Sequence, residues 1–259
     1  MPDAIDVDTI ATELAELSPR RILRRVYELF EPDDVAISFS GAEDVVVIDF
    51  ACDVLAQAGR KPRVFSLDTG RLHPETYRFF AKIEQHYDLR IEYCFPQAEA
   101  VQSLVRRKGL FSFVEDGHQE CCGIRKVEPL RRQLGSVRAW VTGQRRDQSP
   151  NTRATVPVFE RDPGFAGRDG GPLYKLNPLA ALSSAEVWDT IRAFEIPYNP
   201  LHERGMISVG CEPCTRAILP GEHERAGRWW WEDATKKECG LHIGSAGAPE
   251  SNRDDDGTA

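Results

Sequence analysis

Predicted strands and helices alternate along this chain, and this alternation constrains the fold more than any other feature of the sequence. The apolar, β-branched run DVAISFS has the composition of a buried strand and ends in Ser-Gly. The stretch EDVVVIDFACDVLAQAG that follows has the pattern of a largely buried helix, closed by Gly59. The same order recurs in RVFSLDTG, HPETYRFFAKIEQHY, RIEYCFP and AEAVQSLVRRKG. Strands joined through helices run parallel, so we predict an α/β fold: a mostly parallel twisted sheet with helices on both faces.

The middle of the chain adds less regular elements. The stretch IRKVEPLRRQLG predicts a short helix with Pro129 as a possible break, and VRAWVTG predicts a further strand. Two short strand-like pieces at 156–159 and 173–176 lie among turn residues, and we expect them to pair as an edge hairpin. The S-x-x-E capping box that starts at Ser183 predicts the beginning of another helix. In such a sheet, ligands bind at the carboxyl ends of the strands.

Length, charge and apolar content exclude several classes of function. With 259 residues, 41% of them hydrophobic, the chain has enough apolar surface for the core of a soluble globular protein. No apolar run approaches the roughly 20 residues of a membrane helix, and the acidic N-terminus does not resemble a signal peptide. We therefore expect a cytoplasmic protein without a membrane partner. The formal net charge of −8 argues against nucleic acid as a partner, although local arginine clusters can hold a small anion.

The loop after the first strand is a candidate anion site. In SFSGAEDVV, the candidate residues Ser38, Ser40, Gly41 and Ala42 lie at a turn into a helix, where free N–H groups and the helix dipole favour an anion. A plain strand-to-helix connection is the alternative. Asp68 follows the second strand on the same sheet edge, where it can contact a ribose or a base, or instead cap the next helix.

Four of the seven cysteines occur in two close pairs. Cys121 and Cys122 are adjacent, and adjacent cysteines rarely bridge because the ring strains the peptide between them. Cys211 and Cys214 form a C-x-x-C pair in GCEPCTR. Four thiolates suit tetrahedral zinc or an iron–sulfur cluster, and a reducing cytosol favours metal binding or catalysis over disulfides. Cluster, zinc and unliganded thiols remain open on spacing alone.

A fifth cysteine lies apart from these pairs. Cys239, in KKECGLHIG, follows Lys236 and Lys237 and precedes His242 by three residues. Nearby cations lower the pKa of a thiol and raise its thiolate fraction, which favours a nucleophile. A tail cysteine can also be inert. The final stretch, 244–259, is small, polar and acidic, and we predict that it is a flexible, disordered tail.

Several stretches together resemble a known family. They occur in the family's order: SFSGAEDVV, SLDTGRLHPETY, ECCGIRKVEPLRR, VTGQRRDQSPNTR, NPLHERGMISVGCEPCTR, RAGRWWWE and KKECGLH. The chain resembles, over about 34–242, the thioredoxin-dependent adenylyl-sulfate reductases, the iron–sulfur branch of the phosphoadenylyl-sulfate reductase family. That family belongs to the PP-loop superfamily with an adenine nucleotide alpha hydrolase-like fold. The loop departs from the PP-loop pattern S-G-G-x-D-S at Ala42 and Val45, which favours a shorter or different anion than that of ATP.

The resemblance implies a domain organisation and an activity. It implies a helical N-terminal segment at 1–33, a PP-loop-type nucleotide-binding α/β domain with the cluster site at 34–219, and a segment with the catalytic cysteine at 220–243. The implied reaction reduces adenosine 5′-phosphosulfate (APS) to sulfite and AMP in sulfate assimilation and cysteine biosynthesis. Cys239 would form an S-sulfocysteine intermediate that thioredoxin or glutaredoxin resolves, with His242 beside it. The oligomeric state stays open, a homo-oligomer being one option.

The resemblance also implies the cofactor and the anion-binding residues. Cys121, Cys122, Cys211 and Cys214 would ligate a [4Fe-4S] cluster. The substrate's sulfate and phosphate would contact cations that the family's motifs place in this chain at Lys126, Arg153, Arg225 and Arg228. Arg145 and Arg146 are further candidates. Fixed cations around a sulfuryl transfer compensate the charge that builds on the leaving phosphate.

Other functions remain as alternatives. The nearest is an enzyme that reduces 3′-phosphoadenosine 5′-phosphosulfate (PAPS), or one that accepts both substrates. A PP-loop enzyme that thiolates tRNA should show an intact S-G-G-x-D-S loop and a basic surface, and this chain has neither. A zinc-stabilised module without activity would explain the paired cysteines but would leave Cys239, His242 and the arginines without a role.

Overall fold

The computed structural model describes residues 5–149 and 152–233. Cys239, His242 and the tail at 244–259 lie outside these residues, so the predictions about them stay predictions. In the described parts of the chain, no helix has both the length and the apolar character needed to cross a membrane.

A single mixed sheet forms the centre of the described chain. Its strands lie in the order β3-β2-β1-β4-β6-β5, and all neighbours are parallel except β5 and β6, which pair antiparallel. The strands are β1 (Val35–Ser38), β2 (Arg63–Leu67), β3 (Ile91–Cys94), β4 (Ala139–Val141), β5 (Phe159–Arg161) and β6 (Tyr174–Leu176). The mostly parallel sheet predicted from the alternating pattern is confirmed.

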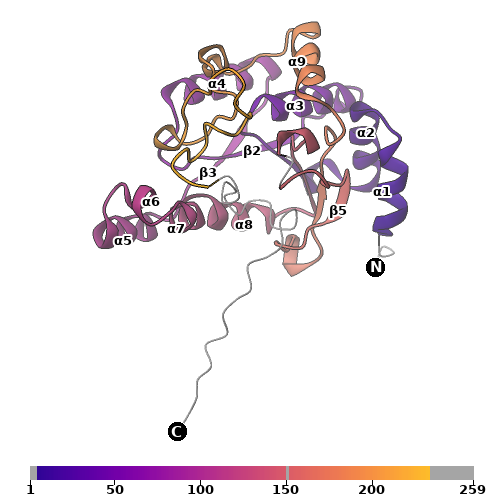
Figure 1. Ribbon diagram of the computed structural model, residues 1–259. Helices are drawn as coiled ribbons and strands as arrows, with labels where there is room; N and C mark the ends of the chain where they lie inside the picture. The colour runs from indigo at the N-terminus through magenta and orange to yellow at the C-terminus, as the bar shows by residue number, and fades with distance from the viewer. Residues whose placement is uncertain (1–4, 150–151, 234–259) are drawn as a thin grey trace.

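Helices cover both faces of this sheet (Figure 1). The α-helices are α1 (Val7–Ala15), α2 (Pro19–Leu29), α3 (Ala42–Ala56), α4 (Pro74–Tyr87), α5 (Ala98–Lys108), α6 (Ser112–Glu115), α7 (Gln119–Cys122), α8 (Glu128–Leu134) and α9 (Ser184–Ala193). A π-helical turn, η2 (Gly123–Val127), joins α7 to α8. Short 3₁₀ turns are η1 (Pro32–Asp34), η3 (Arg146–Gln148), η4 (Arg168–Gly170), η5 (Pro200–Arg204) and η6 (Glu212–Cys214).

Two hydrophobic cores lie on opposite faces of the sheet because side chains alternate along a strand. In β1, Val35 and Ile37 belong to the larger core, which also holds residues of α2, α3, α4 and α9. The residue between them, Ala36, belongs to the second core, together with Leu130 and Leu134 of α8. The strands are therefore buried on both sides, as the near-continuous apolar run of β1 requires.

The segment that carries Cys121 and Cys122 is helical throughout, and Pro129 does not break it. The chain passes from α7 through the π turn into α8, with the Glu128 N–H bonded to the carbonyl of Gly123. Pro129 sits in the first turn of α8, where the N–H that it lacks is not required. The wider π turn therefore accommodates the proline and continues the helix.

The predicted hairpin and capping box are both present. β5 and β6 pair antiparallel, with Phe159 opposite Leu176 and β5 at the edge of the sheet. The prediction placed the first of these strands three residues too early in the chain. At the start of α9, Ser183 and Glu186 bond reciprocally: the Ser183 N–H donates to the carboxylate at 2.8 Å, and the Glu186 N–H donates to the hydroxyl at 3.3 Å.

Candidate active site

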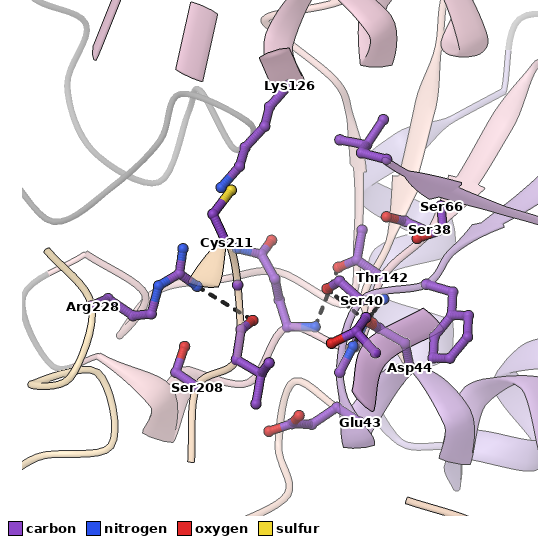
Figure 2. Close-up of a pocket in the computed structure, with 18 of the residues that line it drawn as sticks. Ser38, Ser40, Glu43, Asp44, Ser66, Lys126, Thr142, Ser208, Cys211 and Arg228 are labelled. Atoms are coloured by element: carbon purple, nitrogen blue, oxygen red, sulfur yellow. Dashed lines mark hydrogen bonds between the residues drawn. The ribbon is translucent and has the colours of Figure 1, made fainter. Parts of the chain in front are cut away.

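A cleft opens at the carboxyl ends of β1 and β4. These two strands are neighbours, and the chain leaves β1 toward β2 on one side while β4 lies on the other, so the cleft is at the switch point of the sheet. It encloses about 1340 Å³ of empty space that opens to solvent. Its polar lining includes the hydroxyls of Ser38, Ser40, Ser66, Thr142 and Ser208 and the cations of Lys126, Arg153, Arg225 and Arg228. Figure 2 shows part of this lining, including Lys126, Cys211 and Arg228.

The loop after β1 is organised around the buried carboxylate of Asp44. This carboxylate accepts hydrogen bonds from the N–H groups of Ser40 at 2.7 Å, Gly41 at 2.9 Å and Gly143 at 2.9 Å, and from the Ser40 hydroxyl at 3.0 Å. Burial and the neighbouring Glu43 carboxylate raise the pKa of Asp44 to about 6, against these hydrogen bonds. The Asp44 carboxylate therefore occupies N–H and hydroxyl donors of the loop that we predicted would bind an anionic ligand.

Gly143, which follows β4, allows the loop after β1 to pack closely against the end of that strand, and Gly41 is not needed for this contact. A Cβ on Gly143 would lie 2.6 Å from Cβ of Glu43 and 2.9 Å from the Asp44 nitrogen. Only glycine at 143 therefore lets the chain after β4 approach the start of α3 this closely. Gly41 has an extended backbone, and the nearest atom to its Cβ position is 3.5 Å away. The fold itself does not require glycine at 41, and the space there faces the cleft.

The four paired cysteines all line a second, smaller cavity. Cys121 and Cys122 reach it from α7, and Cys211 and Cys214 reach it from η6, far along the chain. The cavity has about 310 Å³ of empty space, and its other lining residues are Arg71, Phe113, His118, Arg125 and Lys126. Hydrogen bonds hold the C-x-x-C turn against the end of β2, since the Glu212 N–H donates to the Arg71 carbonyl at 2.8 Å.

Charge in this cavity differs from one thiol to the next. Burial raises the pKa of Cys211, but Lys126, the Thr69 hydroxyl and two arginines outweigh it, so the pKa of this thiol is lowered overall. The Thr69 oxygen lies 3.2 Å from the Cys211 sulfur. Burial raises the pKa of Cys121, and it raises that of Cys214 to about 12. Among Cys121, Cys211 and Cys214, Cys211 is thus the one whose thiolate these surroundings favour.

Lys126 and Cys211 form a wall shared by the two cavities. Both residues line the large cleft and also the cysteine cavity, and Figure 2 shows the Lys126 ammonium directed at the Cys211 sulfur. Lys126 is 8% exposed, and its Nζ lies 5.5 Å from the centre of the Trp229 ring. Lys126 sits on the π turn that directly follows α7, the helix that carries Cys121 and Cys122.

Arg228 is held between a glycine and an aromatic ring. Its Cζ lies 4.5 Å from the centre of the Trp229 ring, and a Cβ on Gly210 would lie 2.4 Å from that same Cζ. Trp229 is 1% exposed and stacks on His118 at a ring separation of 4.0 Å. His118 in turn bonds Glu232 through its backbone N–H and its Nδ1. These contacts pack the segment after Leu219 against the cysteine cavity.

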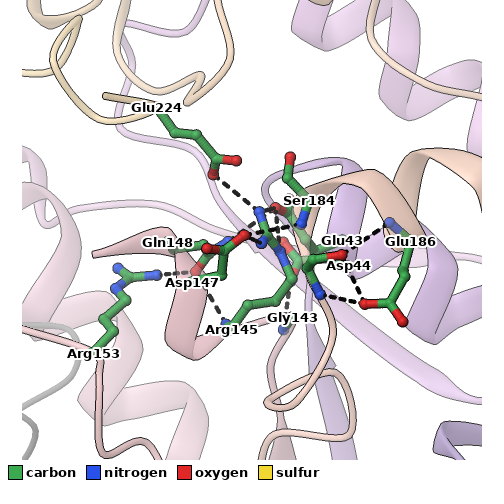
Figure 3. Close-up of polar contacts among 11 residues, drawn as sticks. Glu43, Asp44, Gly143, Arg145, Asp147, Gln148, Arg153, Ser184, Glu186 and Glu224 are labelled. Atoms are coloured by element: carbon green, nitrogen blue, oxygen red, sulfur yellow. Dashed lines mark hydrogen bonds and ion pairs between the residues drawn. The ribbon is translucent and has the colours of Figure 1, made fainter. Parts of the chain in front are cut away.

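Arg145 forms a buried ion-pair network below the cleft (Figure 3). Its guanidinium contacts Glu43 at 3.0 Å, Glu224 at 3.0 Å and Asp147 at 3.2 Å. The side chain is 1% exposed and is not among the residues that line the cleft. Arg145 therefore links the start of α3 to the segment that carries Arg225 and Arg228, and it is not positioned to bind a substrate anion.

The structure brings most of the predicted site residues together. Ser38, Ser40, Gly41, Lys126, Arg153, Arg225 and Arg228 line the cleft, and the four paired cysteines line the adjoining cavity. Two predicted residues are not among the residues that line the cleft. Ala42 is buried at the start of α3, and Asp68 accepts hydrogen bonds from the Gly70 N–H at 2.8 Å and the Tyr77 hydroxyl at 2.9 Å.

Other lining residues were not predicted. Ser66, Thr142 and Gln144 follow or end strands on the ligand-binding edge, which is a signal that the sequence carried. Ile207, Ser208 and Val209 come from an irregular segment, for which periodicity gives no signal.

The fold and the site define a class: an α/β protein with a cation-lined cleft at a switch point of its sheet, beside a four-cysteine cavity. The phosphoadenosine phosphosulfate reductase domain model matches residues 34–217, and the chain belongs to this family. It is 57% identical, over 95% of its length and 90% of the relative's, to an adenosine 5′-phosphosulfate reductase of Pseudomonas aeruginosa strain LESB58.

Plant proteins and solved structures are also similar. The chain is 58% identical, over 93% of its length, to a probable chloroplastic 5′-adenylylsulfate reductase of Oryza sativa. It spans about half the length of this and of another plant relative. Its fold is similar to that of a phosphoadenylyl-sulfate reductase from Candida auris, with a TM-score of 0.65, 25% identity and coverage of 82% of this chain and 96% of that one. An FMN adenylyltransferase of Candida glabrata shares the fold alone, at a TM-score of 0.53 and 14% identity.

Proposed function

We propose that this protein reduces adenosine 5′-phosphosulfate to sulfite and AMP, with thioredoxin or a similar dithiol protein as reductant, in cytoplasmic sulfate assimilation. The single observation that carries the proposal is the wall of Lys126 and Cys211, which joins a cation-lined cleft to a four-cysteine cavity. The names of the bacterial and plant relatives support the same substrate. The proposed organisation is a domain at 34–219 followed by a segment at 220–243 that carries the nucleophile.

The proposed reaction has two sulfur-transfer steps. The Cys239 thiolate attacks the sulfur of the substrate, an S–S bond forms, and the S–O bond to the phosphate breaks, so that AMP leaves with the electron pair. A thiolate of reduced thioredoxin then attacks the Cys239 sulfur and sulfite leaves. The second thioredoxin thiol resolves the mixed disulfide, so the dithiol supplies both electrons and Cys239 is regenerated. The proposed role of His242 is to tune Cys239 or to assist this exchange.

The cations of the cleft suit the first step. Lys126, Arg153, Arg225 and Arg228 line one continuous cleft, and negative charge grows on the phosphate as AMP leaves. Preorganised cations stabilise such charge more in the transition state than in the ground state. Lys126 is buried and Arg228 is 6% exposed, so water screens these two charges weakly.

The loop after β1 supports APS over PAPS. Three N–H groups and one hydroxyl of this region already bond the Asp44 carboxylate, and the Glu43 carboxylate lines the cleft beside it. Two carboxylates repel a further phosphate group, whereas the hydroxyls of an unphosphorylated ribose carry no charge. We therefore propose that the enzyme prefers the substrate without a 3′-phosphate.

The cysteine cavity supports the [4Fe-4S] proposal. Its four thiols converge from two segments, and Arg71, Arg125 and Lys126 line it with positive charge, which suits an anionic thiolate-ligated centre. Cys121, Cys122, Cys211 and Cys214 would hold the cluster. When bound, it would supply electron-rich sulfur and iron next to Lys126. Anaerobically purified protein should be brown with four irons per chain, and colourless protein with stoichiometric zinc would exclude the cluster.

Mass spectrometry after incubation with APS alone tests the activity. The C-terminal peptide of the wild-type protein should gain a sulfonate on Cys239, because no reductant is present to remove it. Cys239→Ser should keep the brown colour and form no adduct. The matched control is Cys52→Ser, which changes a half-buried thiol packed against the larger core and should leave the adduct yield unchanged. An adduct of undiminished yield in Cys239→Ser would remove this residue from the role.

A further inference from the structure

One buried side chain in the wall of the cleft has no partner for its polar atoms. Gln144 follows β4 and is 3% exposed, and within the described residues neither its Oε1 nor its Nε2 has a hydrogen-bond partner. Its backbone is used, since its N–H donates to the Thr142 hydroxyl at 3.2 Å. Leaving a buried carboxamide unpaired costs free energy, and native proteins keep such groups where a ligand or an ordered water pairs them.

A nearby glutamine shows the contrast. Both polar atoms of the Gln148 carboxamide have partners: its oxygen accepts from the Arg145 N–H and from Arg153, and its nitrogen donates to Glu43 at 2.9 Å. Gln148 is therefore a structural connection in the wall of the cleft, whereas the carboxamide of Gln144 bonds no residue that the structure describes. Both glutamines line the cleft, and of the two only Gln144 has a carboxamide without a partner among the described residues.

Gln144 lies just beyond the carboxyl end of β4. Ala139 and Val141 face the larger core, and Trp140 faces the second core on the other side. Trp140 lines the cleft, and so do Thr142 and Gln144, which follow the end of the strand. Gln144 therefore lies at the switch point, opposite the loop that follows β1.

The chemistry of a carboxamide selects the part of the ligand. Phosphate and sulfate oxygens only accept hydrogen bonds, and Lys126, Arg153 and Arg228 line the cleft as donors for them. The flat apolar base suits Leu67 and Phe80, which also line the cleft. A ribose hydroxyl both donates and accepts, which matches a carboxamide, whose oxygen accepts and whose NH2 group donates. We propose that Gln144 binds a ribose hydroxyl of the nucleotide; this rests on the proposed function, in which the cleft takes an adenine nucleotide.

Calorimetry with AMP, 2′-deoxy-AMP and 3′-deoxy-AMP tests the contact. Wild-type protein should bind AMP about tenfold more tightly than one of the two deoxynucleotides, since a buried polar group would lose its partner. Gln144→Met, which is similar in size, should weaken AMP binding about tenfold and leave the affinity for that deoxynucleotide unchanged. Equal affinities of the wild-type protein for all three nucleotides, or an equal loss for all three in the variant, would overturn the proposal.

Thermal unfolding without ligand separates binding from structure. Gln144→Met removes two unpaired buried atoms, so its unfolding temperature should be equal to or above that of the wild type. A lower temperature, or a variant that fails to fold, would mean that Gln144 is structural. Gln133→Met is the matched control outside the cleft: it loses a 2.7 Å hydrogen bond to Glu92 and should bind all three nucleotides like the wild type.

The test is independent of the proposed reaction. If the protein distinguishes AMP from a deoxynucleotide through Gln144 but forms no adduct with APS, the ribose contact is supported and the proposed activity is overturned. If the protein forms the adduct but binds all three nucleotides equally, the activity is supported and the ribose contact is overturned.

Discussion

Lys126 is a cation that the fold holds between two cavities. Its stem comes from the π turn, its ammonium lies near the Trp229 ring, and it lowers the pKa of Cys211. A charge in this position can act on a thiolate on one side and on a substrate anion on the other. This is the physical basis for treating Lys126 as the connection between the cysteine site and the chemistry.

Replacing Lys126 should reduce turnover of APS without affecting assembly of the iron site. Lys126→Ala keeps all four cysteines, so we expect iron content and the visible absorption spectrum to match the wild type. We expect kcat/KM for APS to fall about 10²- to 10³-fold, as for the loss of one preorganised group at a developing charge. Lys82→Ala, on an exposed part of α4, is the control and should be unchanged. Unaffected turnover in Lys126→Ala would break the proposed connection.

Gly210 positions Arg228 through the absence of a side chain. Gly210→Ala would insert a methyl group 2.4 Å from Cζ of Arg228 and displace the guanidinium from the Trp229 ring. We expect KM for APS to rise about tenfold in steady-state assays, because an ion pair to a substrate anion is weakened. Gly135→Ala, where the nearest atoms lie at 3.5 Å, should retain the wild-type KM. A normal KM in both variants would show that Arg228 does not bind substrate.

Single site residues could be predicted where they belong to a sequence motif. They could not be predicted where only the packing around them reveals their role. The four cysteines and Lys126 stand in recognisable stretches, and the structure gathers them at adjoining cavities. Arg145 has the same charge as Arg153, and only the carboxylates around it reveal that it is a structural cation. The place of Gln144 after β4 could be read from the sequence, but its unpaired carboxamide is visible only once the neighbouring side chains are placed.

At the scale of elements, the π turn determines how the cysteine helix faces the cleft. It contains one residue more per turn than an α-helix would, and it lies between Cys122 and α8. Removing a residue there rotates the two cysteines relative to α8 by about 100°, the angle of one residue in an α-helix.

Deleting Gly123 should therefore abolish the cysteine site without unfolding the helix. We expect helical circular dichroism like that of the wild type, together with loss of bound iron. Gly123→Ala keeps the register, and a Cβ there meets no atom within 4 Å, so this control should bind iron normally. Full iron content after the deletion would contradict the proposed ligand role of Cys121 and Cys122.

Elements were predictable where periodicity was strong. The strands β1 to β4 and the helices α3, α4, α5 and α8 were predicted from apolar runs and helix-ending residues, and the pairing of β5 with β6 was also expected, whereas the short helices α6 and α7 were not predicted. Pro129 suggested a break that the structure does not contain, because a π turn is a local hydrogen-bond shift with no sequence period of its own. The segment at 207–210, which lines the cleft, has neither strand nor helix periodicity.

At the scale of the whole molecule, Arg145 ties the sheet to the segment that closes the cleft. Arg145→Met leaves the carboxylates of Glu43 and Glu224 facing each other without their cation. Breaking a buried ion pair from one side costs about 3–5 kcal/mol, and we expect a loss of that size in the free energy of unfolding measured with urea. Arg192→Met, in an exposed pair with Asp189, should cost less than about 1 kcal/mol. Equal costs in the two variants would argue against the network.

The cysteine cavity also has a consequence for the order of events during biosynthesis. Cys121 and Cys122 are made first, and Cys211 and Cys214, at the start and end of the η6 turn, follow only after the three remaining strands β4, β5 and β6. At about 5–20 residues per second, the ribosome adds Cys211 on the order of ten seconds later. During that interval the nascent chain holds two adjacent thiols without their partners. The complete set exists only after Cys214 has been added, so loading of the site must follow that step and depends on a cell that keeps the two early thiols reduced.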